Sequence, residues 1–265
     1  MKKKKKYGQH FLINKRIIEE IVNYQDLKDK TVIEIGPGEG VLTVELAKVA
    51  KEVFAFEIDL DLKPTLVNLS HIYPNVVFYY EDILKVDLEK FHKEHKIDFS
   101  ALVANIPYYI TGPILMLLLN TRQIEIATIM MQKEVGERIF STSGKDYNAL
   151  SVLMQTFFEI KVVKKVSKNN FNPPPKVDSI ILNFARKKGV EKLIKNEANY
   201  KEFIDVSFKQ KRKTFVNNLA SGFNIEKSIV LEKLLKINAN FDPLIRAEKI
   251  SINEFILYSN EWYDD

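Results

Sequence analysis

The sequence contains no cysteine, which excludes disulfide bonds and metal sites held by thiolates. It has only four histidines, and their spacing does not match a set of metal ligands. His92 and His95 are about one helical turn apart, and we interpret them as part of a solvated helix face. No metal site is therefore predicted.

Long apolar runs are also lacking. The longest, around Pro113–Leu119, is much shorter than the roughly 20 residues that cross a bilayer, and the amino terminus is a lysine run without an apolar signal core. With 265 residues, of which 46% are hydrophobic, the chain can still bury a full core. We expect a monomeric cytoplasmic protein with one large and one smaller domain and no membrane partner.

Acidic residues are missing from the first eighteen positions, where Lys2–Lys6, Lys15 and Arg16 concentrate positive charge. A second basic cluster lies inside a predicted helix and comprises Lys209, Lys211, Arg212 and Lys213. Such clusters are typical of proteins that bind the phosphate backbone of nucleic acids, although a lysine-rich proteome also produces some of them. The charge pattern favours a nucleic-acid partner.

Glycine is scarce, yet three of the nine glycines fall in Gly36-Pro37-Gly38-Glu39-Gly40, between a predicted strand (Thr31–Ile35) and a predicted helix (Val41–Val49). Glycines in such a turn let a ligand approach the backbone closely. The spacing differs from the dinucleotide fingerprint, because the third glycine that supports a pyrophosphate is not in place. The turn predicts a nucleotide-type cofactor site.

Acidic residues follow the next two predicted strands. Glu57 ends the strand Val53–Glu57, 21 positions after Gly36, where an acid can accept both ribose hydroxyls; the alternative is a solvated strand end. Asp82 follows the strand Val76–Tyr80 and can accept a hydrogen bond from an adenine amine, with Ile83 packing on the ring.

The apolar run Ala101–Ala104 predicts a buried parallel strand that ends in Asn105-Ile106-Pro107-Tyr108. Asn105 offers a carbonyl oxygen, Pro107 constrains the turn so that the Ile106 carbonyl is exposed, and Tyr108 offers a π face. Two acceptors and one stacking surface can hold the exocyclic amine of a nucleobase and make its nitrogen lone pair available. The alternative is an ordinary β-turn after a strand.

The second half continues with a predicted strand (Glu125–Met131), a helix (Gln132–Phe140) and two further strands (Phe157–Val166 and Asp178–Phe184). A strand hairpin after alternating strands and helices predicts an α/β fold whose mixed sheet has one antiparallel strand. Phe171, between the last two strands, is either a core residue or a second stacking surface for a base. Stacking is favoured, because the flanking prolines leave the ring little core to enter.

After Lys187-Lys188-Gly189 the pattern becomes wholly helical. We therefore predict two domains, at residues 1–188 and 189–265. The second, small and all-helical, carries the basic cluster of Lys209 to Lys213 and is predicted to bind RNA.

The ordered set of the glycine turn, Glu57, Asp82 and Asn105–Tyr108 resembles the class I S-adenosylmethionine-dependent methyltransferases that act on adenine amines, which have a Rossmann-like fold. Gly8-Gln9-His10-Phe11-Leu12 is similar to the amino-terminal motif of the ribosomal RNA adenine dimethyltransferases. The segments Phe171–Ser179, Phe208–Thr214 and Arg246–Ile250 resemble the group that modifies small-subunit RNA (the KsgA family) more than the group that modifies large-subunit RNA (the Erm family). Asn148-Ala149 departs from the usual Gly-Arg of the small-subunit group.

The resemblance implies transfer of methyl groups from S-adenosylmethionine to two adjacent adenosines in the 3′-terminal hairpin loop of small-subunit RNA, within an immature 30S particle. It implies cofactor contacts, a catalytic set and an RNA-binding set. The cofactor contacts are His10, Leu12, Gly36, Gly38, Glu57, Asp82 and Asn105. The catalytic set is Asn105, Ile106, Pro107, Tyr108 and Phe171. The RNA-binding set is the basic cluster.

Three other hypotheses remain at this point. The first is a large-subunit RNA methyltransferase of the macrolide-resistance type. The second is a non-catalytic ribosome-assembly factor, against which the intact Glu57, Asp82 and Asn105 argue. The third is a nucleotide-dependent oxidoreductase, which the glycine spacing disfavours.

Overall fold

The computed structural model describes residues 10–263, so Gly8, Gln9 and the lysine run lie outside the described residues. The chain divides into two compact units. Unit 1 comprises residues 1–136 and 159–186, and unit 2 comprises residues 137–158 and 187–265. The chain enters unit 2 for the second time at residue 187, two positions before Gly189, but residues 137–158 also belong to unit 2.

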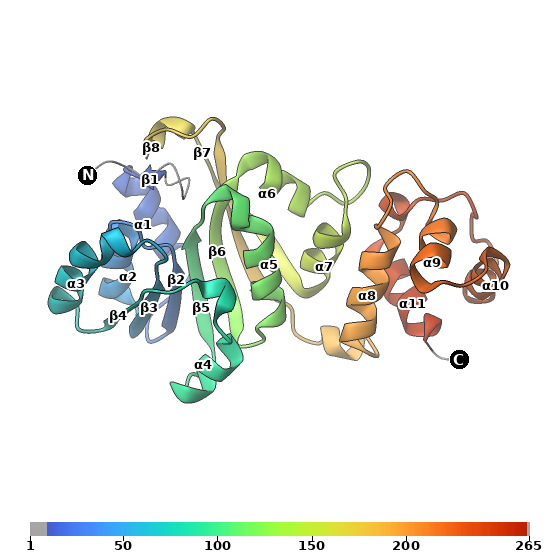
Figure 1. The fold of residues 1–265 in the computed structure, drawn as a ribbon, viewed down its shortest axis with the longest axis horizontal. Coiled ribbons are helices and arrows are strands. Elements are labelled where there is room, and N and C mark those ends of the chain that lie inside the picture. Colours follow the sequence, from blue (N-terminus) through green and yellow to red (C-terminus); the bar gives the residue numbers. More distant parts are fainter. Residues whose placement is uncertain (1–9, 264–265) are drawn as a thin grey trace. The chain divides into compact units, whose positions relative to one another are not determined.

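Unit 1 is built on a seven-stranded sheet (Figure 1). In spatial order its strands are β4 (Val76–Tyr79), β3 (Glu52–Phe56), β2 (Thr31–Ile35), β5 (Ser100–Asn105), β6 (Ile124–Gln132), β9 (Ser179–Arg186) and β7 (Phe158–Val166). Strands β4, β3, β2, β5 and β6 pair in parallel, whereas β9 is antiparallel to β6. The predicted mixed α/β sheet with one antiparallel strand is confirmed.

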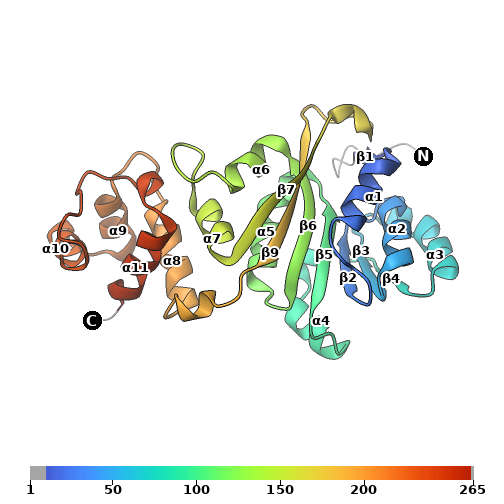
Figure 2. The same cartoon turned by 180° about the vertical axis from the view of Figure 1, so that it is seen from behind.

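The order of the strands reverses between β2 and β5, which are neighbours although β3 and β4 come between them in the sequence. Right-handed crossovers on either side of this point place helices on both faces of the sheet. Helix α5 (Thr111–Asn120), for example, lies in front of β6 in Figure 1 and behind it in Figure 2. The remaining helices of unit 1 are α1 (Lys15–Asn23), α2 (Val41–Val49), α3 (Lys63–Ile72), α4 (Leu88–Glu94) and the first turn of α6 (Lys133–Ile139). A strand-order reversal leaves a crevice at the carboxyl ends of the strands, where α/β proteins bind ligands.

The segment before β2 is ordered and pairs with a distant part of the chain. Helix α1 buries Ile17, Ile18, Ile21 and Val22 on one apolar face. The strand β1 (Phe11–Leu12) pairs antiparallel with β8 (Phe171–Asn172). This pairing connects the amino-terminal segment to the loop between β7 and β9, which contains Pro173, Pro174 and Pro175.

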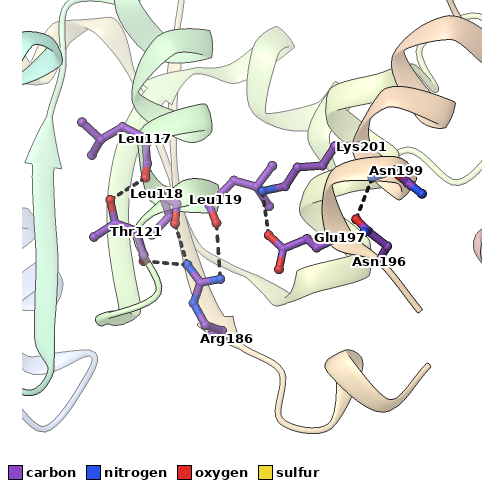
Figure 3. Close-up of polar contacts among 9 residues, drawn as sticks. All are labelled: Leu117, Leu118, Leu119, Thr121, Arg186, Asn196, Glu197, Asn199 and Lys201. Atoms are coloured by element: carbon purple, nitrogen blue, oxygen red, sulfur yellow. Dashed lines mark hydrogen bonds and ion pairs between the residues drawn. The ribbon is translucent and has the colours of Figure 1, made fainter. Parts of the chain in front are cut away.

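Arg186, the last residue of β9, joins this strand to the end of α5 and the start of β6 (Figure 3). Its guanidinium donates to the carbonyls of Leu118 (2.6 Å) and Thr121 (3.0 Å), at the end of α5, and to that of Ile124 (3.1 Å). A cation at a helix carboxyl terminus satisfies carbonyls that have no partner within the helix. Arg186 therefore fixes the carboxyl terminus of α5 at the amino end of β6, which is the end of the sheet remote from the cavity described below.

Unit 2 is helical in its described part. It contains the end of α6, α7 (Ala149–Phe157), α8 (Glu197–Ser207), α9 (Phe215–Phe223), α10 (Lys227–Ile237) and α11 (Ile252–Trp262). Helix α8 begins at the N-cap Asn196, which accepts from the Asn199 N–H (3.1 Å), and Glu197 pairs with Lys201 at 2.6 Å (Figure 3).

The core of unit 2 is aromatic. Phe203 contacts the rings of Phe215 and Trp262 with centroids 5.9 and 5.7 Å apart, and Phe215 contacts Phe255 at 6.0 Å. These separations lie within the range of favourable aromatic pairs. The predicted helical character of the carboxyl-terminal part is confirmed, while α7 is a helix that the strand and helix patterns did not predict.

Two expectations were wrong. His92 is buried rather than solvated: its ring nitrogens lie 2.6 Å from the Leu88 carbonyl and 2.9 Å from Ser100 Oγ, and burial lowers its pKa. His95, in contrast, is exposed as expected, although its ring also stacks on that of Phe91 with centroids 4.1 Å apart. The basic cluster also does not lie in a helix, because α8 ends at Ser207 and α9 begins at Phe215.

Candidate active site

A cavity of about 330 Å³ opens at the carboxyl ends of β2, β3 and β5, within unit 1. Every residue of the predicted cofactor and catalytic sets lines it. These are His10, Leu12, Gly36, Gly38, Glu57, Asp82, Asn105, Ile106, Pro107, Tyr108 and Phe171. The fold therefore brings together side chains that are up to 161 positions apart, from His10 to Phe171. Their individual roles stay predictions.

The glycine turn forms one wall of the cavity. Gly36 and Gly38 both adopt the left-handed backbone region, with φ of 70° and 60°. A Cβ on Gly38 would lie 2.8 Å from Cε1 of Phe11, so the turn is also closely covered by the amino-terminal segment. Both conformation and space therefore call for glycine at this position.

Glu57 lies directly after β3 and is 4% exposed. Its two carboxylate oxygens accept hydrogen bonds from the Gly38 N–H (3.1 Å) and the Asp59 N–H (2.8 Å). Burial raises the pKa of Glu57, and these two N–H donors partly offset the effect. The carboxylate is thus held rigidly at the cavity wall, with further acceptor capacity for two hydroxyl groups.

Asp82 caps a short 3₁₀ helix (Ile83–Lys85), and one of its oxygens accepts from the Leu84 N–H at 3.1 Å. Ile83 is buried beside it and lines the same cavity. The Asp82 carboxylate can accept a hydrogen bond at the edge of a ligand ring, and the apolar Ile83 side chain can pack on the face of that ring. This combination fits an adenine ring with an exocyclic amine, as the sequence predicts.

Glu34, the fourth of the five residues of β2, is a buried acid that the sequence patterns did not single out. It is 1% exposed. Burial raises its pKa to about 8; the Thr43 hydroxyl acts in the opposite direction, and the negative charge of Glu57 raises the pKa further. Its place in a largely apolar strand, two residues before Gly36, was the available signal.

Asn105 and Tyr108 stand where the strand β5 ends. Asn105 is half-buried. A Cβ built on Gly36 would lie 3.7 Å from the main-chain carbonyl oxygen of Asn105, so the end of β5 and the glycine turn are adjacent. Pro107 leads into a 3₁₀ helix (Tyr108–Ile110), closed by a bond from the Ile110 N–H to the Pro107 carbonyl at 3.1 Å. The turn is fixed by its own hydrogen bonds and by the proline ring.

Phe171 lines the cavity but is only 4% exposed, and it belongs to a hydrophobic cluster with Leu12, Ile18 and Ile181. The prolines were expected to leave this ring little core to enter, and this was wrong. Because β1 pairs with β8, Phe171 joins the same hydrophobic cluster as the buried face of α1. Packing accounts for its observed position. A stacking role for Phe171 stays a prediction.

The charged side chains that line the cavity are acidic. Glu39, Glu57, Glu81 and Asp82 contribute to its lining, while no lysine or arginine of the described residues does. A pyrophosphate would meet repulsion here. A nucleoside that carries a sulfonium and an ammonium group would be attracted, so the residues present fit S-adenosylmethionine and disfavour a dinucleotide cofactor.

The basic cluster occupies a loop of unit 2, residues 208–214, which we call the basic loop. Lys209, Lys211, Arg212 and Lys213 are all exposed in it. The buried Asn218, 2% exposed, holds this loop: its amide accepts from the Gln210 N–H (3.1 Å) and donates to the Ser207 (2.8 Å) and Gln210 (3.2 Å) carbonyls. The sequence alone did not indicate this role for Asn218.

No helix in residues 10–263 is long and apolar enough to cross a membrane.

Comparisons with known proteins give matches over nearly the whole chain. The family model described as ribosomal RNA adenine dimethylase matches residues 1–261. A relative from Onion yellows phytoplasma, named ribosomal RNA small subunit methyltransferase A, is 40% identical and aligns with 98% of this chain and 96% of its own. A relative of the same name from Bacillus pumilus is also 40% identical, over 97% of this chain and 90% of its own.

Two solved structures are similar over nearly the whole chain. A dimethyladenosine transferase from Plasmodium falciparum has a TM-score of 0.78 and 26% identity, covering 94% of this chain and 96% of its own. The 23S rRNA methyltransferase ErmE has a TM-score of 0.69 and 26% identity, covering 95% and 98%.

Proposed function

Because this chain belongs to the ribosomal RNA adenine dimethylase family, we propose that it converts two adjacent adenosines of small-subunit ribosomal RNA to N6,N6-dimethyladenosine. The observation that carries the proposal is the convergence of Glu57, Asp82 and the Asn105–Tyr108 turn on one cavity at the strand-order reversal. The names of the curated relatives favour small-subunit over large-subunit RNA.

The methyl donor, S-adenosylmethionine, supplies an activated methyl group on a sulfonium that is already a good leaving group. Glu57 would accept hydrogen bonds from its ribose hydroxyls, and Asp82 would accept one from its adenine amine while Ile83 would pack on the ring. The glycine turn at Gly36 and Gly38 lets the ligand lie against the backbone. The acidic lining favours a cationic ligand over an anionic one.

The target adenine is held by the turn after β5. The carbonyl oxygens of Asn105 and Ile106 accept from the exocyclic amine, which directs the nitrogen lone pair toward the methyl group. The Tyr108 ring stacks on the base and offsets part of the cost of removing it from the RNA stack. Catalysis is then mostly positioning, and no strong base is required.

RNA affinity comes mainly from the basic loop. Four exposed cations on one short loop can contact several phosphates of an RNA backbone, whose neutralisation releases counterions. We assign unit 2 to RNA binding and unit 1 to catalysis. The proposed partner is the immature 30S particle, and the proposed location is the cytoplasm, where ribosomes are assembled. We propose that the protein acts there as a monomer.

The experiment is methyl transfer from labelled S-adenosylmethionine to small-subunit particles that lack the modification, with large-subunit particles as the control. Nucleoside mass spectrometry of the RNA should show N6,N6-dimethyladenosine at two neighbouring positions of the 3′-terminal hairpin loop. Preferred labelling of large-subunit RNA would move the protein to the macrolide-resistance type. No labelling of either particle would support a non-catalytic assembly role.

A further inference from the structure

Tyr108 is held by side chains from two distant parts of unit 1. Its hydroxyl lies 2.9 Å from Ser179 Oγ, and its ring stacks on that of His10 with centroids 6.0 Å apart and planes at 26°. Both distances fall in the ranges of real contacts. The orientation of the ring is therefore set by more than its own turn.

Ser179 is a rigid anchor. It is fully buried, at 0% exposure, and as the first residue of β9 it pairs with Gln132 at the end of β6. The preceding residue, Asp178, accepts from the Lys133 N–H through its carbonyl (3.0 Å) and from the Lys168 N–H through its side chain (3.0 Å). The serine hydroxyl is thus attached to the sheet itself and not to a mobile loop.

His10 is fixed through the same segment of the chain. Its Nδ1 lies 2.8 Å from the carbonyl oxygen of Pro173, and the strand β1 that follows it pairs with β8. The ring of Tyr108 is therefore constrained at its edge by Ser179 and on one face by His10. Tyr108 is half-buried and lines the cavity, so part of its ring remains accessible to a ligand there.

We propose that Ser179 is a positioning residue for methyl transfer, whose hydroxyl holds the Tyr108 ring so that its face away from His10 receives the target adenine. The inference rests on the proposed function and adds a residue to it. Without this hydrogen bond the tyrosine ring can rotate about its side-chain torsions. A base stacked on a rotated ring would present its amine out of line with the methyl group, and small misplacements are costly in displacement reactions.

The test measures kcat at saturating S-adenosylmethionine and RNA for Ser179→Ala, Tyr108→Phe and the double variant. Removing either partner of the hydrogen bond should lower kcat by about threefold to tenfold, with the Kd for S-adenosylmethionine unchanged. The double variant should be no slower than the slower single variant, because both changes remove the same interaction. Ser179→Thr keeps the hydroxyl and should recover most of the rate.

The matched control is Ser100→Ala. Ser100 is also buried and also bonds a ring side chain, His92, but at the amino end of β5, remote from the cavity. It should lower the melting temperature about as much as Ser179→Ala while leaving kcat unchanged. A wild-type kcat in Ser179→Ala, or multiplying effects in the double variant, would overturn the role of Ser179. Absence of methyl transfer by the wild-type protein would instead overturn the proposed function.

Discussion

The cavity of unit 1 and the basic loop of unit 2 hold their functional groups in opposite ways. In the cavity, Glu57 and Tyr108 are anchored by hydrogen bonds to partners elsewhere in the fold. Glu34 does not line the cavity, but it belongs to the strand β2 that leads to it and is buried at a cost to its charged form. In the basic loop, the four cations are exposed to solvent. One buried side chain, Asn218, organises the backbone beneath them.

This difference follows from what each region has to do. Methyl transfer depends on angles and distances, so its groups need a rigid and partly dry environment. Attraction of a phosphate backbone depends on charge, which acts over a Debye length and tolerates mobile side chains. We therefore expect changes in the cavity to affect rate or cofactor affinity, and changes in the basic loop to affect RNA affinity.

The largest effect is expected for Asn105→Ala, which removes an acceptor for the target amine. At saturating S-adenosylmethionine the rate of methyl transfer should fall by at least about 100-fold, as when an active-site hydrogen bond is lost, while RNA affinity stays nearly constant. Filter binding and a transfer assay measure the two quantities. Asn75→Ala is the control, because its half-buried amide lies just before β4, at the other edge of the sheet. Wild-type transfer by Asn105→Ala would remove Asn105 from the chemistry.

The next effect concerns pH and Glu34. Its pKa is about 8 in the folded protein and ordinary when unfolded, so the folded state holds the proton more tightly. The stabilising contribution is full below the unfolded pKa and is lost as pH rises from about 4.5 to 8, by about 2–4 kcal/mol. Urea unfolding between pH 5 and 8 should show this loss, and Glu34→Gln should flatten it. An equally steep pH dependence in the variant would contradict the assignment of this loss to Glu34.

Glu57→Ala should weaken S-adenosylmethionine binding by about 1–3 kcal/mol, because the ribose hydroxyls and two backbone N–H groups lose their acceptor. Calorimetry measures the change. Glu57→Gln keeps one acceptor oxygen and the shape of the side chain, and should lose less. Since the pKa of Glu57 is raised, wild-type affinity should also decline on acidification at a pH above the ordinary range of a glutamate. Unchanged affinity in both variants would place the cofactor elsewhere.

Replacing Lys211, Arg212 and Lys213 by alanine should weaken RNA binding by about tenfold at physiological salt. Each lost phosphate contact should reduce the slope of log Kd against log salt by about 0.7–0.9. The control variant replaces Lys28, Lys30 and Lys51, three exposed lysines before β2 and β3, at the edge away from the cavity. If both triple variants change the slope equally, the basic loop has no special part in RNA binding.

The smallest effect is expected for Asn218→Ala. The four cations remain, but the backbone of the basic loop loses two hydrogen bonds, both at Gln210, and the end of α8 loses a third, at the Ser207 carbonyl. RNA affinity should fall by about twofold to fivefold, which is less than the effect of removing the charges themselves. Asn183→Ala, which removes another buried amide from β9, should change stability but not RNA affinity. Equal RNA affinities for wild type and Asn218→Ala would show that the loop needs no support.

The sequence predicted those parts of the fold that depend on local pattern. The strands around Ile33, Phe54 and Leu102 are apolar runs that end in a polar or glycine residue, and parallel strands bring such ends to one edge. For this reason the residues of the cavity could be grouped before the structure was known. The resemblance to methyltransferases added His10 and Leu12, which no local pattern connects to that edge.

Features that depend on long-range packing were not predictable. Phe171 was expected to lack a core. The core it enters is formed by the pairing of β1 with β8, and these two segments begin 160 positions apart, at Phe11 and Phe171, so no local pattern reveals it. His92 looked solvated because its helix is polar overall, yet Ser100 lies close enough to bond it. The roles of Ser179 and Asn218 depend on tertiary hydrogen bonds, and a lone serine or asparagine in a sequence does not reveal its partner.

Single-turnover kinetics tests the separation of the two regions most directly. RNA is bound first, at concentrations that saturate each variant, and S-adenosylmethionine is then added to excess. Asn105→Ala should bind RNA like the wild type and fail to transfer methyl groups, whereas the Lys211/Arg212/Lys213 variant should need more RNA but transfer at the wild-type rate once saturated. The account would be contradicted if the basic-loop variant stayed slow at saturation, or if Asn105→Ala lost RNA binding together with its activity.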